Sequence, residues 1–328
     1  MSEIASKELC KNPLVSVSII TYNHKDYIAE AIESVLKQKV NFEYEIIIGD
    51  DFSNDGTQEI IKAYQRKYPD KIQLILHPRD YDCIPGRINN ITNLYACRGK
   101  YTAMLDGDDL WLSEDKLQTQ VDFLEDHDDF VLSFHETLLR YDDGKEVLFS
   151  EDLCYFNKTV FNHEDVTEAW FIQTSSIVFR NKLFGEFPEW FWEVYSADYA
   201  IQLLVSRYGK VKYFPELLSV RNHHSQSFSA TQNTTWAHLK RRESEKKIFS
   251  QNFPTYEVYK KYSSAVFKLK GAHENLKKFR PAAFFLELSK FMVYSTSFAT
   301  SRQLSTTTKI RFLKRNFLHS LRSRPSKE

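Results

Sequence analysis

Short apolar runs alternate with amphipathic segments along the first hundred residues of the chain. Apolar residues recur at helical spacing over 27–36 and again over 60–64, which predicts two helices. Strands separated by helices of this length favour right-handed βαβ crossovers, so we expect an α/β fold with a mostly parallel sheet flanked by helices. Ligands of such sheets bind beyond the carboxyl ends of the strands. The apolar runs that predict these strands are 14–20, 44–49, 72–76 and 101–105.

The alternation is weaker after Leu105. From Trp236 onward the chain is basic and its apolar residues have helical spacing, which predicts a helical C-terminal extension. Between these two points we predict helices over 117–124 and 199–208, strands over 130–134 and 170–180, and a turn at 141–144.

The formal net charge of the chain is zero, but its two ends carry opposite charge. Residues 236–328 hold 21 Lys and Arg against 6 Glu and no Asp, whereas residues 1–235 hold 23 basic against 38 acidic residues. A composition change of this size predicts a domain boundary near Trp236. Together with the strand pattern it predicts three parts, 1–110, 111–235 and a basic helical region at 236–328.

Composition excludes several classes of protein. With 25 Phe, 18 Tyr and 42% hydrophobic residues the chain has enough apolar material for a core, which argues against disorder. The chain contains no run of about 18 apolar residues, so no membrane-spanning helix is predicted. Residues 1–12 lack the apolar centre of a signal peptide, and the four Cys show no paired spacing. We therefore expect a cytoplasmic protein without disulfides or structural zinc.

Polar or acidic residues follow three of the predicted strands. Each group taken alone is explained by a helix N-cap or a turn, because Asp, Asn, Ser and Thr favour both. Their common position at strand ends is what makes them candidate binding residues. The three groups are Thr21-Tyr22-Asn23, the segment from Asp50 and Asp51 to Thr57, and Asp106-Gly107-Asp108-Asp109.

The third group is the least consistent with a purely structural role. Three carboxylates within four residues repel one another, and burial of their ionised forms is costly without a cation. Hard oxygen ligands suit Mg²⁺ or Mn²⁺, and Mg²⁺ in proteins binds one or two carboxylates plus substrate phosphates. The alternative is a solvated turn that caps a helix beginning near Ser113. The metal interpretation predicts a diphosphate ligand.

Five segments, in order and at the expected spacing, resemble the family 2 glycosyltransferases of the Rossmann-like GT-A fold. The resemblance covers about residues 13–230. It implies a metal-dependent, inverting transfer of a sugar from a UDP-sugar donor, with donor binding by 1–110 and acceptor binding by 111–235. The segments are VSVSIITYN (15–23), AIESVLKQ (31–38), EIIIGDDFSNDGT (45–57), GKYTAMLDGDDLW (99–111) and KLQTQVDFL (116–124).

The resemblance also implies roles for individual residues. Thr21, Tyr22, Asn23 and Asp51, with its neighbour Asp50, would hold the nucleoside, because carboxylates accept hydrogen bonds from uracil N–H or ribose hydroxyls. Asp106, Asp108 and Asp109 would hold Mg²⁺ or Mn²⁺ against the diphosphate. Arg79 and Arg87 are candidates to neutralise phosphate, but both are equally explained as surface arginines, and the sequence does not choose between them.

The implied catalytic base is a carboxylate that enters a helix in the second half. Asp198 in SADYAIQLL (196–204) matches best, with Glu193 as the alternative, although Asp198 alone would be interpreted as a helix N-cap. The preceding Trp190 and Trp192, and Trp170, are candidates for the acceptor site or for the core.

The segment LSVRNHHSQSFS (218–229) resembles the family's Tyr-Arg-x-His segment, which folds over the diphosphate. Alignment on His224 puts Asn222 where the family has Arg, and Arg221 lies one residue early. The sequence leaves open which of Arg221, His223 and His224 contacts phosphate or metal.

The basic tail predicts an anionic membrane surface as a partner. A membrane-bound enzyme would suit a glycan or lipid-linked oligosaccharide acceptor in surface polysaccharide biosynthesis; nucleic acid is not expected, because the acidic first part would repel it. A solvated extension or an oligomer contact is the alternative for the tail. For the whole chain, the alternatives are a sugar nucleotidyltransferase and a non-catalytic membrane-surface scaffold. The apolar stripe is Ile310, Leu313, Phe317 and Leu321, with Lys309, Arg311, Arg315 and Arg322 around it.

Overall fold

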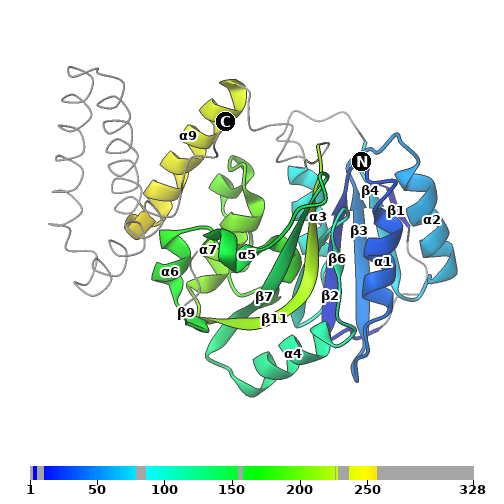
Figure 1. The fold of residues 1–328 in the computed structure, drawn as a ribbon, viewed down its shortest axis with the longest axis horizontal. Coiled ribbons are helices and arrows are strands. Elements are labelled where there is room, and N and C mark those ends of the chain that lie inside the picture. Colours follow the sequence, from blue (N-terminus) through cyan, green and yellow to red (C-terminus); the bar gives the residue numbers. More distant parts are fainter. Residues whose placement is uncertain are drawn as a thin grey trace, which may run out of the picture. The chain divides into compact units, whose positions relative to one another are not determined.

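A computed structural model of the chain describes residues 3–5, 11–78, 86–153, 158–225, 227 and 236–256. The chain divides into two compact units, Met1–Val166 with Trp170–Arg241, and Thr167–Ala169 with Arg242–Glu328. The first unit is an α/β fold built on one large sheet (Figure 1). This confirms the fold class expected from the sequence.

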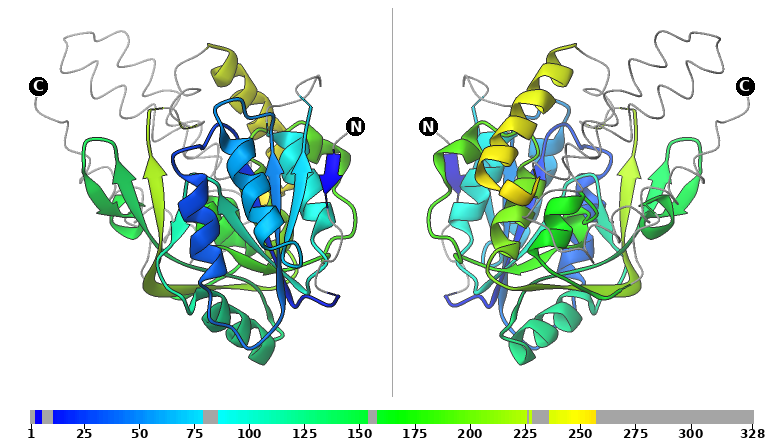
Figure 2. Two further views of the ribbon diagram at one scale, coloured as in Figure 1. Left: turned by 90° about the vertical axis from the view of Figure 1, so that its right-hand side faces the viewer. Right: turned by 90° about the vertical axis from the view of Figure 1, so that its left-hand side faces the viewer.

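Strands and helices alternate through the first half of this unit, and all four predicted strands are present. Figure 2 shows α1 and α2 side by side over the sheet. Every residue of β3 is buried, so both faces of the sheet are covered here. The elements are β2 (Val15–Thr21), α1 (Ile28–Leu36), β3 (Tyr44–Asp50), α2 (Thr57–Lys67), β4 (Ile72–Leu76), α3 (Arg87–Ala96) and β5 (Tyr101–Asp106).

Helix α3 was not predicted, because four of its six buried residues are polar. Asn89 Nδ2 donates to Gly49 O at 2.9 Å, and Asn93 Nδ2 donates to Ile19 O at 2.8 Å. A Cβ on Gly49 would lie 1.8 Å from Asn89 Oδ1, so only glycine allows the helix to dock here. Asparagines that bond to strand carbonyls replace the apolar spacing by which helices are usually found in sequence.

The order of strands brings three strand ends together. The sheet runs β1-β4-β3-β2-β5-β10-β7-β11-β6, where β1 is Glu3–Ala5. β2 lies between β3 and β5 and is parallel to both. Thr21 is in register with Asp50, and Ile20 with Asp106. The loops after β2, β3 and β5 therefore leave the sheet at the same edge.

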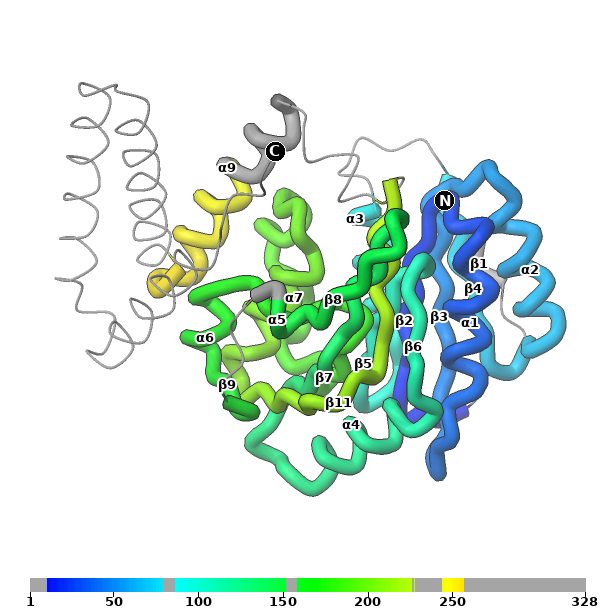
Figure 3. The backbone as a smooth tube through the Cα atoms, viewed as in Figure 1, coloured from blue at the N-terminus to red at the C-terminus, as the bar shows by residue number. Residues whose placement is uncertain are grey.

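The second half of the unit continues the sheet with mixed directions. β10 pairs antiparallel with both β5 and β7, β7 is parallel to β11, and β6 is antiparallel to β11. The tube in Figure 3 shows β7 and β11 running side by side. The elements are β6 (Leu110–Trp111), α4 (Lys116–Asp126), β7 (Phe130–Tyr141), β8 (Glu146–Leu148), α5 (Phe149–Leu153), β9 (Val160–Phe161), α6 (His163–Glu168), η1 (Thr174–Ser176), β10 (Val178–Arg180), η2 (Glu189–Trp192), α7 (Ala197–Ser206) and β11 (Lys210–His223).

One predicted strand is wrong for most of its length. Only Val178–Arg180 of the segment 170–180 is a strand, and Thr174–Ser176 is a 3-10 turn. Ser176 Oγ donates to Gln173 O at 2.7 Å, so local side-chain bonds bend the chain here. The predicted turn at 141–144 is confirmed by a hydrogen bond from Gly144 N to Tyr141 O.

Helix α9 (Trp236–Asn252) begins where the charge balance of the sequence changes sign. In the second unit Phe249 and Phe253 are buried, and their rings meet edge to face. Within the described ranges, no helix is both long enough and apolar enough to cross a membrane. The predicted apolar stripe at Ile310–Leu321 and the candidate phosphate ligand Arg79 lie outside the described residues.

Candidate active site

The loops after β2, β3 and β5 form one continuous rim, as their positions in the sequence predicted. Asp51 N donates to Thr21 O at 2.9 Å, and Gly107 N donates to Ile20 O at 2.8 Å. A Cβ on Gly107 would lie 2.9 Å from Thr21 Cβ and Oγ1 and 3.0 Å from His24 Nδ1. The first loop and the acidic loop thus approach so closely that only glycine fits at 107.

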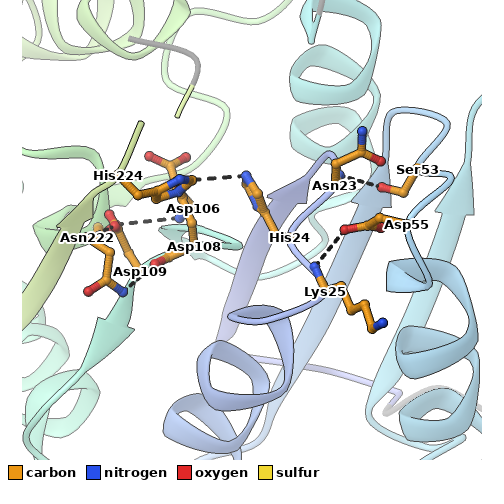
Figure 4. Close-up of polar contacts among 11 residues, drawn as sticks. Asn23, His24, Lys25, Ser53, Asp55, Asp106, Asp108, Asp109, Asn222 and His224 are labelled. Atoms are coloured by element: carbon orange, nitrogen blue, oxygen red, sulfur yellow. Dashed lines mark hydrogen bonds and ion pairs between the residues drawn. The ribbon is translucent and has the colours of Figure 1, made fainter. Parts of the chain in front are cut away.

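The first two loops hold each other through backbone amides (Figure 4). Asn23 has a left-handed φ of 54°, and its N–H donates to Ser53 Oγ at 2.8 Å. Its side chain accepts from Asn54 N, while Asp55 accepts from Lys25 N. The predicted nucleoside residue Asn23 therefore shapes the rim through its backbone N–H and its side-chain oxygen.

Asp50 and Asp51, both predicted to bind the nucleoside, have different surroundings. Asp50 is fully buried, and its Oδ2 accepts from Ser53 N and from Gln58 Nε2, whereas its Oδ1 has no hydrogen-bond donor among the described residues. Asp51 Oδ2 accepts from Gly86 N, but none of the described residues donates to its buried Oδ1. Burial raises the pKa of Asp51; the Gly86 amide opposes this and the charge of Asp50 adds to it.

Thr21 and Tyr22 offer further contacts beside Asp51. Thr21 is buried, and its hydroxyl oxygen has no hydrogen-bond partner among the described residues. Tyr22 is 51% exposed at the rim. An open acceptor, a buried hydroxyl and an aromatic face are the groups that a nucleoside can use.

Asp106 and Asp108 are held differently. Burial raises the pKa of Asp106 to about 7, the charges of Asp108 and Asp198 add to this effect, and Arg221 opposes it. Burial would also raise the pKa of Asp108, but the hydrogen bond from His224 Nε2 at 3.1 Å and the charge of His24 keep it below its usual value. His24 Nε2 lies 3.7 Å from the same Asp108 oxygen. Figure 4 shows these side chains grouped beside the first loop.

Asp109 connects the acidic loop to the second half of the sheet. Its Oδ2 accepts from Ser175 Oγ, and its Oδ1 accepts from Asn222 N at 3.0 Å. Asn222 Nδ2 also donates to Asp108 O at 2.6 Å. Both carboxylate oxygens of Asp109, which was predicted as a metal ligand, are therefore engaged within the protein. Among the described residues, no three acidic, His or Cys side chains converge as a metal-binding group.

Helix α7 brings the predicted base to the acidic loop. Asp198 lies in its first turn and accepts a long hydrogen bond, 3.4 Å, from Thr174 Oγ1. Asp198 is close enough for its charge to raise the pKa of Asp106. The alternative base, Glu193, follows η2 and is exposed to solvent.

The contacts of the 221–224 segment distinguish the residues that the sequence left open. Arg221 Nη1 donates to Gln173 Oε1 at 3.1 Å, and its charge reaches Asp106 and Asp109. His224 is buried, stacks on Tyr27 and bonds Asp108. The ring of His223 instead stacks on that of Tyr141, 5.0 Å away. Of the three residues that the sequence left open, Arg221 and His224 therefore face the acidic loop, and His223 does not.

Of the two candidate phosphate ligands, only Arg87 is among the described residues. It is buried and packs inside the protein. Its Nη2 donates to Val194 O, and its guanidinium lies over the ring of Phe191. This contact joins α3 to the segment that leads into α7. Of the predicted acceptor-site aromatics, Trp170 packs against Phe149, whereas Trp192 is 45% exposed.

The sequence assigned no role to four residues of the site: Gly107, His24, Ser175 and Asn222. The signal for Gly107 was its position between two acids. A solvated turn would tolerate a side chain at this position, so a glycine is not required there. No local signal marks the other three, because their partners are distant in sequence.

Comparison with known proteins agrees with this geometry. The model of glycosyl transferase family 2 matches residues 16–185. The uncharacterized protein Rv1520 of Mycobacterium tuberculosis is 30% identical over 212 residues, which cover 64% of this chain and 59% of that protein. The putative teichuronic acid biosynthesis glycosyltransferase TuaG of Bacillus subtilis is 38% identical over 112 residues, which cover 34% of this chain and 42% of TuaG.

A solved structure shows the same fold. The crystal structure of S. aureus TarS 1-349 in complex with UDP-GlcNAc is 17% identical, covers 88% of this chain and 91% of that one, and has a TM-score of 0.51. The likeness confirms the expected GT-A fold. Since the family model covers more than half of the residues, the chain belongs to glycosyl transferase family 2.

Proposed function

We propose that this protein transfers a sugar from a UDP-sugar to a hydroxyl of a glycan or lipid-linked oligosaccharide, with inversion, in surface polysaccharide biosynthesis. The observation that carries the proposal is the closeness of Asp198, at the start of α7, to Asp106 in the acidic loop. A candidate base thus lies beside a candidate site for the leaving diphosphate. Membership of glycosyl transferase family 2 supports the reaction class.

Asp106 and Asp108 fit a divalent cation, Mg²⁺ or Mn²⁺. The raised pKa of Asp106 reflects two carboxyl groups crowded in a buried place, and a cation removes that cost. When bound, the ion would stabilise the negative charge of the departing diphosphate. Two carboxylates with phosphate oxygens and water are an ordinary ligand set for Mg²⁺. Asp109 would position the loop through Ser175 and Asn222.

The donor nucleoside fits the rim formed by the first two loops. Asp51 Oδ1 would accept from a uracil N–H or a ribose hydroxyl, and Thr21 Oγ1 is a second buried group without a partner among the described residues. Tyr22 would place its exposed ring against the base. Arg221, whose charge reaches the acidic loop, would attract the diphosphate. TarS, which shares the fold, is described with UDP-GlcNAc bound.

Asp198 would accept the proton of the acceptor hydroxyl as the oxygen attacks the anomeric carbon. Thr174 holds one oxygen of this carboxylate, which leaves the other for the acceptor. The exposed ring of Trp192, six residues earlier, is suited to the apolar face of an acceptor sugar. The name of TuaG supports a role in polysaccharide synthesis. The positive charge of residues 236–328 supports binding of the enzyme to an anionic membrane surface.

Calorimetric titration of UDP, with and without Mn²⁺, tests the proposal together with a turnover assay on UDP-sugars. We expect metal-dependent UDP binding in the wild type and slow hydrolysis of the correct UDP-sugar. Asp108→Ala should lose both binding and turnover, because it removes one of two metal ligands. Wild-type protein that neither binds UDP with Mn²⁺ nor cleaves any UDP-sugar would refute the proposal.

A further inference from the structure

Helix α4 begins with a fully buried lysine. Lys116 is 0% exposed, and burial lowers its pKa well below the usual value. None of the described residues accepts a hydrogen bond from its Nζ. Lysines are almost never fully buried without a partner, because the loss of hydration is costly. The residue therefore needs an explanation other than stability.

The start of α4 is fixed in a way that keeps Lys116 inside. Leu117 N donates to Gln38 Oε1 at 2.9 Å, and Gln38 Nε2 donates to Ser113 O at 2.7 Å. Turning the lysine outward would require unwinding this first turn. A methionine of similar length would fill the same space without a buried amine, so packing alone does not call for lysine.

The attractive contact that the structure gives Lys116 is with an indole ring. Its Nζ lies 3.9 Å from the centre of the Trp111 ring. An amine over a tryptophan face is attracted by the ring's electrons, most strongly when it is protonated, and this geometry fixes the plane of the ring. His135 lies close enough for the charge of Lys116 to lower the pKa of the imidazole further, an effect that opposes a second cation there.

Trp111 is linked to the acidic loop by hydrogen bonds through Ser175. Its Nε1 donates to Ser175 O at 2.8 Å. Ser175 Oγ in turn donates to Asp109 and accepts, at 3.5 Å, from Asp106 N. One serine thus bonds both the first and the last acid of the loop. The orientation of the indole sets the position of that serine.

We propose that Lys116 is a positioning residue for donor binding. Its amine holds the Trp111 ring, and the ring, through Ser175, holds the Asp106–Asp109 loop in the arrangement that receives a cation and a diphosphate. The inference rests on the proposed function, because the effect it predicts is on UDP binding. A buried lysine lowers the stability of the fold, and a role in donor binding explains its presence.

The test compares Lys116→Met with wild type by calorimetric titration of UDP in Mn²⁺ and by thermal unfolding. We expect the Kd for UDP to rise about tenfold while the melting temperature is unchanged or higher. A purely structural lysine would give the opposite pattern, a lower melting temperature with normal UDP binding. Lys71→Met is the matched control. Lys71 Nζ lies 4.3 Å from the centre of the Tyr44 ring, at the start of β3, whereas the acidic loop follows the end of β5. It should leave the Kd unchanged.

A second set of variants tests the route through the indole. Trp111→Phe keeps an aromatic face but removes the N–H that Ser175 accepts from, so it should also weaken UDP binding. If both residues act through Ser175, the double variant should lose much less than the product of the two single losses. Multiplying losses, or a Lys116→Met protein that binds UDP like wild type, would overturn the inference. Wild-type protein that binds no UDP would instead refute the proposed function, and the inference with it.

Discussion

His224 and Asp108 are joined by a hydrogen bond, with His224 Nε2 3.1 Å from Asp108 Oδ2. The bond spans the two halves of the sheet, since Asp108 follows β5 and His224 follows β11. His224 is itself held by stacking on Tyr27, at the start of α1. One carboxylate of the proposed cation site is therefore oriented by residues from two other, distant parts of the chain.

Loss of this bond should weaken donor binding. In His224→Ala, Asp108 keeps only the more distant His24, and we expect the Kd for UDP in Mn²⁺ to rise about 10- to 100-fold, the usual range for a hydrogen bond to a charged group. Titration calorimetry measures the change. The control is His223→Ala, which removes the stack on Tyr141; if it weakens UDP binding as much, the specific role of His224 is wrong.

Replacing the proposed base should separate binding from chemistry. Asp198→Asn keeps the shape of the side chain but cannot take a proton, so kcat should fall by about 10²–10⁴ with the Kd for UDP unchanged. Glu193→Gln is the matched control, since Glu193 is exposed and follows η2 only five residues earlier. Normal turnover of Asp198→Asn together with an inactive Glu193→Gln would reverse the assignment.

The close approach at Gly107 predicts a functional defect from one methyl group. In Gly107→Ala the new Cβ would meet Thr21 and His24 at about 3 Å, and we expect a loss of about 1–3 kcal/mol in unfolding free energy together with weaker UDP binding. Gly144→Ala provides the control. Its φ of 80° makes alanine strained in a turn between β7 and β8, so it should lower stability but leave UDP binding of the folded protein intact.

Buried His135 predicts a dependence of stability on acid. Burial, with a contribution from the charge of Lys116, lowers its pKa from 6.5 to about 3. Between these values the unfolded chain binds a proton that the folded protein does not, so this residue favours unfolding by up to about 1.4 kcal/mol for each pH unit below 6.5. Urea unfolding of wild type and His135→Gln at pH 7, 6 and 5 measures the effect. The variant should lose less stability on acidification; equal losses would contradict the prediction.

Local patterns were sufficient for the elements that carry the site, but not for the contacts that assemble it. Apolar runs located β2, β3, β4 and β5, and the segments that follow β2, β3 and β5 leave the sheet at one edge as expected. Asp198 was found through the family motif and does lie near Asp106. The strand predictions succeeded because strand ends are marked by neighbouring residues.

Contacts between distant segments were not marked in the sequence. Asp109 resembled Asp106 and Asp108 in sequence, but its bonds to Ser175 and Asn222 depend on how β10 and β11 join the sheet. Helix α3 was missed because asparagines, rather than apolar residues, face the strands. Buried polar contacts between distant segments leave no periodic signal, and they decide which acid is available to a ligand.

The insertion of β10 between β5 and β7 limits how this protein can be divided or rebuilt. A cut after residue 110 would leave β5 with an exposed edge and would strip Asp109 of both its hydrogen-bond donors. Neither fragment would then present a formed acidic loop, and the unpaired edge of β5 would promote aggregation. Chimeras designed to exchange acceptor specificity with relatives should therefore swap surface loops and keep the pairing of β10 with β5 and β7.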